Sequence, residues 1–191
     1  AAPFYGIDLL SGGVPCPPFS VAGKRLGVQD ERNLFDDAIR IVGECQPKAV
    51  MLENVRGFLD RDFAEYRLKI TQTVESYGYE VFWKLLNAAD YSVPQSRQRT
   101  IFIALKKRYA QHFVWPEPLS FHRQTVGDVL YQEMKSCGWD LVDEWKSRAN
   151  GIAPTLVGGS KKHGGADLGP TRSKEAWSKL GVDGHGVADL P

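Results

Sequence analysis

The sequence predicts an α/β fold, because short apolar runs alternate with stripes of helical periodicity in the first part of the chain. The apolar runs at residues 5–10, 49–52 and 101–105 have the length and composition of buried strands. Apolar residues recur at helical spacing over residues 31–45 and again over residues 63–77. Strands that alternate with helices are typical of α/β domains with a parallel sheet.

Glycine and proline mark the ends of the first elements. The strand at 5–10 runs into Gly12-Gly13, and Pro47 follows the first helix. The second helix stops at Gly78, a residue type that favours helix ends. These breaks separate two strand–helix units.

The last two strands of this part are expected to be antiparallel. Residues 79–86 alternate between apolar and other residues as a third strand, and residues 101–105 form the fourth. Residues 87–99 between them show no helical period. Because a parallel crossover usually needs a helix, we expect the fourth strand to run against the third.

The composition changes near residue 115 and becomes richer in Gly, Pro and charge. Residues 125–148 predict one or two short helices, and residues 151–191 are mostly loop-like. We therefore predict a boundary near residue 115, with an α/β portion over residues 1–115 and a small irregular region over residues 116–191.

Bulk composition excludes several classes of protein. The net charge is +1, so nucleic-acid binding would have to come from local patches. Three cysteines without CxxC spacing argue against a disulfide framework or a zinc site, and they indicate a reducing compartment. The four histidines are scattered, so we expect no metal cluster. No apolar run approaches the ~20 residues that cross a membrane, and no secretory signal is expected.

Polar side chains of three kinds are expected at one edge of the sheet. Cys16 follows the first strand in a loop stiffened by Pro15, and Glu53 follows the second strand. Arg97 and Arg99 precede the fourth strand, whose reversed direction brings its beginning to the same edge. Open α/β sheets bind ligands at this edge.

These residue types suit addition chemistry on an electron-poor ring. A thiolate is a strong nucleophile, a carboxyl group can hold a proton against a ring nitrogen, and guanidinium groups bind phosphate. An isolated cysteine is more often a small buried side chain, which is the interpretation given to Cys45 and Cys137. The setting of Cys16 favours a nucleophile instead.

Three motifs in this order resemble those of the cytosine carbon-5 DNA methyltransferases. They are Pro15-Cys16 after a Gly-Gly pair, Glu53-Asn54-Val55, and Gln95-x-Arg97-x-Arg99. The resemblance covers residues 5–105. It implies a Rossmann-like sheet of the S-adenosylmethionine-dependent methyltransferases and methyl transfer to carbon-5 of cytosine in a specific sequence of double-stranded DNA.

The resemblance also implies a mechanism. The target cytosine is flipped out of the duplex, and Cys16 attacks carbon-6 to form a covalent adduct. Glu53 contacts ring nitrogen-3 and the exocyclic amine. Arg97 and Arg99 orient the flipped nucleotide and its phosphates.

Further residues receive supporting roles from the same resemblance. Asn54 holds the loop that carries Cys16, and Pro15 and Gln95 are supporting residues of their motifs. Ser20 lies near the DNA backbone, and Leu34 borders the cofactor. The family's bacterial members imply a cytoplasmic, nucleoid-associated enzyme of restriction–modification. No membrane or metal partner is expected.

The Gly-rich turn and helix that bind the cofactor in this family have no counterpart, and neither do the family's last motifs. We therefore expect that this chain is a fragment, or that a second polypeptide supplies the missing cofactor-binding segment. The isolated chain is expected to be poorly active and to leave an open sheet edge.

The resemblance makes residues 1–115 a catalytic-domain portion that carries the three motifs, and residues 116–191 part of a target-recognition region. Within that region residues 154–172 fit a DNA-recognition loop, because glycines allow close backbone approach. Lys161, Lys162 and Arg172 can meet phosphates, and His163, Ser160 or Arg172 can read base edges.

Three alternatives remain open. The motifs are shared with transfer RNA cytosine carbon-5 methyltransferases, although the long segment after residue 115 favours DNA. A non-catalytic nucleic-acid-binding fragment is compatible with the missing cofactor half. A cysteine hydrolase would need a histidine beside the thiol, and none lies near the three motifs in sequence.

Overall fold

The computed structural model describes residues 2–14, 34–119, 123–156 and 168–186, which fall into two compact units. Unit 1 comprises Ala1–Leu86 and Gln98–Pro116, and unit 2 comprises Asn87–Arg97 and Glu117–Pro191. The sequence analysis placed residues 87–97 in the first portion of the chain, over residues 1–115. They group with unit 2, where β4 (Gln95–Ser96) pairs in parallel with β6 (Ala153–Pro154).

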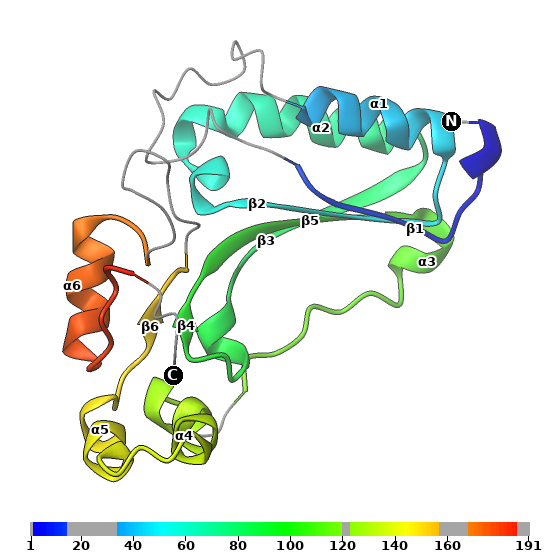
Figure 1. The fold of residues 1–191 in the computed structure, drawn as a ribbon. Helices are drawn as coiled ribbons and strands as arrows, with labels where there is room; N and C mark the ends of the chain where they lie inside the picture. The colour runs from blue at the N-terminus through cyan, green and yellow to red at the C-terminus, as the bar shows by residue number, and fades with distance from the viewer. Residues whose placement is uncertain (1, 15–33, 120–122, 157–167, 187–191) are drawn as a thin grey trace. The chain divides into compact units, whose positions relative to one another are not determined.

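Unit 1 is built on a four-stranded sheet with the order β1-β2-β5-β3 (Figure 1). The strands are β1 (Leu9–Gly13), β2 (Ala49–Val55), β3 (Tyr79–Asn87) and β5 (Gln98–Lys106). β1 is parallel to β2, and β5 is antiparallel to β2. The mixed α/β architecture agrees with the predicted class.

Two backbone hydrogen bonds fix the direction of β5 relative to β3. Lys107 N donates to Gly78 O at 3.4 Å, so the end of β5 lies beside the start of β3. Ala88 N donates to Arg97 O at 3.0 Å at the opposite end. The two strands are therefore antiparallel, and the sequence prediction is confirmed on this point.

Three strands differ clearly from their predicted bounds. β5 begins at Gln98 and not at residue 101, because its ladder with β2 reaches the pair Val55↔Arg99, so the prediction that Arg99 precedes this strand is wrong. β2 continues through Glu53 and Asn54, because its ladder with β5 extends to the pair Val55↔Arg99. β1 covers Leu9–Gly13 instead of residues 5–10 and is largely exposed. Among the described residues β1 has β2 as its only strand neighbour, which explains why it is not a buried strand.

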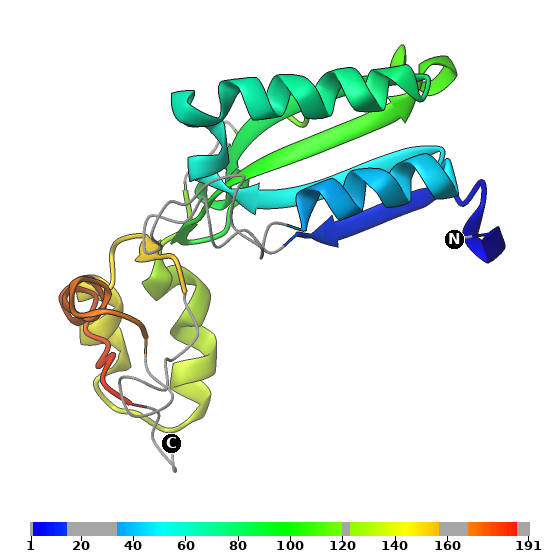
Figure 2. The same cartoon turned by 90° about the horizontal axis from the view of Figure 1, so that it is seen from above.

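Helices α1 (Phe35–Cys45) and α2 (Ala64–Ser76) cover one face of the sheet (Figures 1 and 2). The buried residues of each helix recur at three- and four-residue intervals, as an amphipathic helix requires. The chain leaves α2 at Gly78, whose φ of +88° is a conformation that favours glycine. Short 3₁₀ turns, Arg56–Leu59 and Arg61–Phe63, join β2 to α2.

Aromatic side chains fill the space between these helices and the sheet. Phe35 stacks on Phe58 with ring centroids 4.9 Å apart, and Trp83 meets Phe102 edge-on at 4.7 Å. The Trp83 indole N–H donates to Thr71 Oγ1 at 3.0 Å, so its polar atom is satisfied. This cluster locks α1 and α2 onto the sheet.

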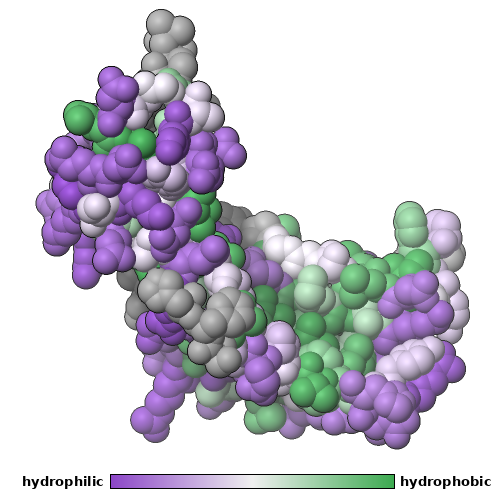
Figure 3. All heavy atoms as spheres, turned by 90° about the horizontal axis from the view of Figure 1, so that it is seen from below, coloured by the Kyte–Doolittle hydropathy of each residue, from purple (hydrophilic) through white to green (hydrophobic). Residues whose placement is uncertain are grey.

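α1 and α2 leave the other face of the sheet uncovered, and this face presents much apolar surface (Figure 3). Leu9 is 51% exposed and Met51 is 45% exposed. Side chains alternate along a strand, and Val50 and Leu52 face the core. Glu53 therefore lies on the same face as Met51, away from the helices.

Unit 2 contains α4 (Val126–Ser136), α5 (Val142–Arg148) and α6 (Thr171–Lys179) around a small core. α4 and α5 confirm the short helices predicted over residues 125–148. The sequence prediction missed α6, because this helix is mostly polar and buries one of its own residues, Trp177. The remaining described elements are the 3₁₀ turns Ala2–Phe4 and Ala88–Tyr91 and the short helix α3 (Lys107–Ala110).

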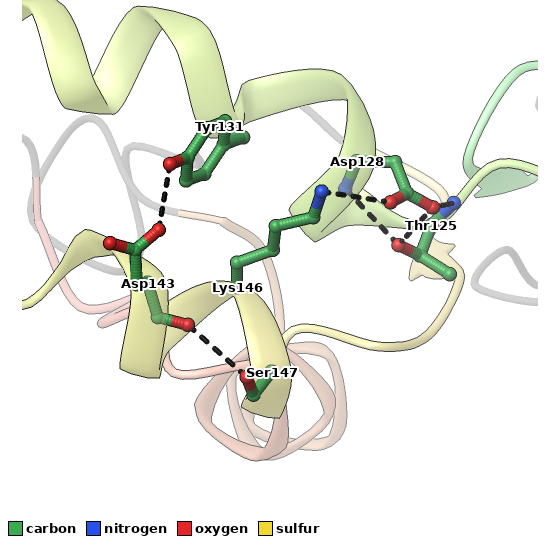
Figure 4. Close-up of polar contacts among 6 residues, drawn as sticks. All are labelled: Thr125, Asp128, Tyr131, Asp143, Lys146 and Ser147. Carbon is green, nitrogen blue, oxygen red and sulfur yellow. Dashed lines mark hydrogen bonds and ion pairs between the residues drawn. The ribbon is translucent and has the colours of Figure 1, made fainter.

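A capping box begins α4 (Figure 4). Asp128 N donates to Thr125 Oγ1 at 3.1 Å, and Thr125 N donates to Asp128 Oδ2 at 3.1 Å. Lys146 of α5 approaches Asp128 at 3.5 Å, and Tyr131 donates to Asp143 at 2.7 Å. These contacts tie α4 to α5.

We predict that Thr125→Ala lowers the free energy of unfolding of unit 2 by about 1 kcal/mol, because the Asp128 amide loses the hydroxyl oxygen that accepts its hydrogen bond. Thr125→Ser keeps the hydroxyl and should stay close to the parent chain. Urea unfolding followed by tryptophan fluorescence measures both variants. Equal losses for the two would show that the hydroxyl is not what stabilises the helix.

Candidate active site

A carboxylate and a guanidinium meet where β2 ends and β5 begins. Arg99 Nε donates to Glu53 Oε1 at 2.6 Å, and the two side chains are 22% and 39% exposed. Both residues are accessible from the face of the sheet that the helices leave uncovered. The antiparallel register that pairs Val55 with Arg99 creates this juxtaposition.

Two neighbours extend the polar cluster. Arg99 Nη1 donates to the Gln98 carbonyl at 2.9 Å, and Arg56 Nη1 donates to Gln98 Oε1 at 3.0 Å. Arg56 is exposed and directly follows the Glu53-Asn54-Val55 motif. The sequence analysis missed Arg56 and Gln98, although their positions beside two motifs were a usable signal.

Glycine flanks the carboxylate on the other side. Gly13, the last residue of β1, is the register partner of Glu53. A Cβ atom at this position would lie 3.6 Å from Glu53 Oε2, so no side chain stands between β1 and the carboxylate. Pro15, Cys16 and Ser20, which follow this strand, lie outside the described residues.

Asn54 is buried at the end of β2, with 3% of its surface exposed. Its side-chain oxygen accepts a hydrogen bond from Val55 N at 2.8 Å. Thr100, also buried, donates from Oγ1 to Val55 O at 3.2 Å. These contacts hold the backbone of β2 at the point where it presents Glu53.

Gln95 and Arg97 belong to unit 2, whereas Glu53 and Arg99 belong to unit 1. Gln95 sits in β4 and pairs with Ala153. Arg97 N donates to Asn87 Oδ1 at 3.0 Å, so the side chain that ends β3 holds the backbone of Arg97.

A groove of about 280 Å³ lies between β1 and α1. Its described lining is mainly apolar and includes Leu10, Gly12, Leu34, Ile41 and Leu52. The one carboxylate among these described residues is Asp37. Leu34, predicted to border a cofactor, is 44% exposed and lines this groove.

The predicted recognition loop is described only in part. Lys161, Lys162 and His163 lie outside the described residues, and Arg172 is exposed in the first turn of α6. The prediction that Arg172 belongs to a loop is wrong, because the helix begins at Thr171. Cys45 is buried as expected, whereas Cys137 is exposed at the end of α4.

Within the described ranges, no cluster of three or more Cys, His, Asp or Glu residues could hold a metal ion. No helix in the same ranges is long and apolar enough to cross a membrane.

Comparison with known proteins gives consistent similarities. A family model described as C-5 cytosine-specific DNA methylase matches residues 3–177. The Type II methyltransferase M.NaeI of Lentzea aerocolonigenes is 53% identical over 97% of this chain and 45% of its own length. The Type II methyltransferase M.NgoMIV of Neisseria gonorrhoeae is 54% identical over 81% of this chain and 49% of its own length. The chain therefore spans about half the length of these curated relatives.

A solved structure is also similar. A protein described as a DNA modification methyltransferase encoded within an E. coli prophage superposes with a TM-score of 0.53 at 31% sequence identity. The match covers 65% of this chain and 34% of that protein.

We predict that the Glu53–Arg99 pair stabilises unit 1 by about 1 kcal/mol, near the upper end for surface ion pairs, because both groups are partly buried. A double-mutant cycle with Glu53→Ala and Arg99→Ala, measured by chemical unfolding, gives the coupling energy. Added salt should reduce it. The matched cycle on Asp37 and Arg40, an exposed pair on α1, should give a smaller coupling. Equal couplings in the two cycles would contradict the prediction.

Proposed function

The chain belongs to the family of C-5 cytosine-specific DNA methylases, and from this we propose that it carries the nucleophile and base-binding residues of a DNA cytosine carbon-5 methyltransferase. The observation that supports this most directly is the Glu53–Arg99 pair beside Gly13, at one end of three adjacent strands. A flipped cytosine needs a carboxyl group and a cation within one nucleotide's width of the nucleophile. This strand edge offers the carboxyl group of Glu53 and the cation of Arg99.

Chain connectivity supports the place of Cys16 in the same site. Gly13 is the register partner of Glu53, and Cys16 follows Gly13 by three residues. A chain of that length spans at most roughly 11 Å, which is within reach of a pyrimidine held against Glu53. The motif resemblance then assigns the thiolate as the attacking group.

The proposed reaction uses each residue at a defined atom. The Cys16 thiolate forms a bond to carbon-6 of the flipped cytosine, while Glu53 holds a proton against nitrogen-3 and accepts from the exocyclic amine. Carbon-5 thereby becomes nucleophilic and gains a methyl group. Loss of the carbon-5 proton to a base then breaks the bond between sulfur and carbon-6 and restores the thiolate. Arg99 orients Glu53, and Arg97 orients the nucleotide.

The groove between β1 and α1 fits part of a cofactor site. Apolar side chains such as Leu34 and Ile41 suit the flat face of an adenosyl group, and Asp37 can accept hydrogen bonds from hydroxyl or amino groups. When bound, S-adenosylmethionine supplies an electrophilic methyl group. The groove measures about 280 Å³, just below the roughly 300–1,000 Å³ of ordinary ligand sites. We infer that other residues complete it.

The missing wall would come from a cofactor-binding segment of a longer protein or from a second polypeptide. Within the described ranges β1 has a strand neighbour on one side only, and its backbone can pair with a further strand. The curated relatives are about twice as long as this chain, which leaves room for such a segment.

Unit 2 is proposed to contact the DNA duplex. Arg172 lies exposed in the first turn of α6, and Lys161, Lys162 and His163 precede it in the sequence. Ser20 is proposed to contact the backbone near the flipped base. Because the matching family is described as DNA methylases and the similar proteins are named Type II methyltransferases, we favour double-stranded DNA over transfer RNA. For the same reason we propose a bacterial, cytoplasmic restriction–modification system acting at the nucleoid.

We predict that Cys16→Ala in the complete protein abolishes methyl transfer and also abolishes the denaturant-stable complex with 5-fluorocytosine duplex DNA. Fluorine at carbon-5 cannot leave as a proton does, so the sulfur bond to carbon-6 persists. Cys137→Ala, which removes an exposed thiol of unit 2, is the matched control and should retain both. Methyl transfer to transfer RNA, measured in the same assay, tests the alternative that the protein is a transfer RNA methyltransferase. A trapped complex with Cys16→Ala would overturn the assignment.

We predict that the isolated chain binds S-adenosylmethionine more weakly than about 100 µM, because a partial groove buries too little of the ligand. Calorimetry on the isolated chain and on the complete protein measures the difference. Micromolar affinity of the isolated chain would show that its own residues form a whole cofactor site.

A further inference from the structure

A second cavity lies at the opposite end of the sheet from Glu53. It measures about 420 Å³ and belongs entirely to unit 1. Among the residues that the structure describes, four cationic side chains and no carboxylate line it. The cations are Lys48, Lys106, Lys107 and Arg108.

Lys106 is held in place at the centre of this group. Its ammonium donates to Gln46 Oε1 at 2.5 Å and to Tyr77 O at 2.9 Å, and it lies 4.0 Å from the centre of the Tyr79 ring. An ammonium group has three N–H donors. Within the described part of the chain, the third donor of Lys106 has no acceptor. Lys106 is thus oriented with one donor left over.

Gln46 is itself fixed. Its backbone adopts a left-handed conformation with φ of 48°, and its amide nitrogen donates to Gly43 O at 2.9 Å. The side-chain oxygen therefore faces Lys106 without needing to reorganise. This second layer makes the cavity a built feature instead of a chance gathering of surface lysines.

The positive charges are only partly compensated. Asp8 pairs with Lys48 at 2.5 Å. Among the described ion pairs, no other carboxylate contacts any of these four cations. Burial and then the repulsion of Arg108 lower the pKa of Lys106, and Arg108 also opposes the charge of Lys48. Like charges that repel across a cavity are relieved by a bound anion.

We propose that this cavity binds a phosphate group, contributed by a small phosphorylated molecule or by the backbone of a nucleic acid. Lys106 and Arg108 would provide the direct contacts, with the guanidinium group suited to bidentate binding of phosphate oxygens. The strand length of β2 separates this site from Glu53, so a phosphate here would not be that of the flipped nucleotide. The site goes beyond the proposed methyl transfer and does not depend on it.

The test is calorimetric titration of the chain with inorganic pyrophosphate at low salt. We expect a single site, which Lys106→Gln and Arg108→Gln each weaken by about ten-fold. Lys69→Gln removes one positive charge from an exposed position on α2 and should change the affinity less than two-fold. Because Lys106 also contacts Gln46 and Tyr77, Arg108→Gln is the decisive variant if Lys106→Gln unfolds.

Fluorescence anisotropy with a labelled DNA duplex distinguishes the two sources of phosphate. If Arg108→Gln weakens binding of the duplex as well as that of pyrophosphate, the natural phosphate belongs to DNA. If only pyrophosphate binding is lost, a small phosphorylated molecule is the ligand. The proposal is overturned if neither probe is affected by Arg108→Gln, or if Lys69→Gln weakens pyrophosphate binding as much.

Discussion

The antiparallel pairing of β5 with β2 is the constraint on which both ends of unit 1 depend. Because the two strands run in opposite directions, the first residues of β5 lie beside the last residues of β2, and Arg99 reaches Glu53. The same register pairs Ala49 with Leu105, and so brings the end of β5 beside the start of β2. A parallel β5 would have placed Arg99 at the wrong edge and would have dispersed the cationic cavity.

Much of unit 1 could be predicted from local sequence patterns. The direction of β5 followed from the lack of a helical period before it, and that direction alone was enough to expect a carboxylate and a guanidinium at one edge. α1 and α2 could be predicted because the apolar residues of each helix face a single core and therefore recur at helical spacing. The Cys16 assignment rests on motif resemblance and chain connectivity, since this residue lies outside the described ranges.

The features that sequence reasoning missed depend on contacts between distant residues. β4 is two residues long and is defined by its pairing with β6, far along the chain. A strand this short has no local sequence pattern that would predict it. α6 is mostly polar and is stabilised where Trp177 enters a core made by α4 and α5. The bounds of β2 were set by its partner β5, which carried the ladder past the last apolar residue of the predicted run.

The chain crosses between the two units three times, because Asn87–Arg97 is grouped with the later residues while Gln98–Pro116 returns to the sheet. Unit 2 is thus an interrupted module and not an appendage that could be excised with a single cut. Severing the chain after Pro116 would leave Gln95 and Ser96 behind without Ala153 and Pro154. A graft of this module onto another scaffold would need three splice points, at 86/87, 97/98 and 116/117.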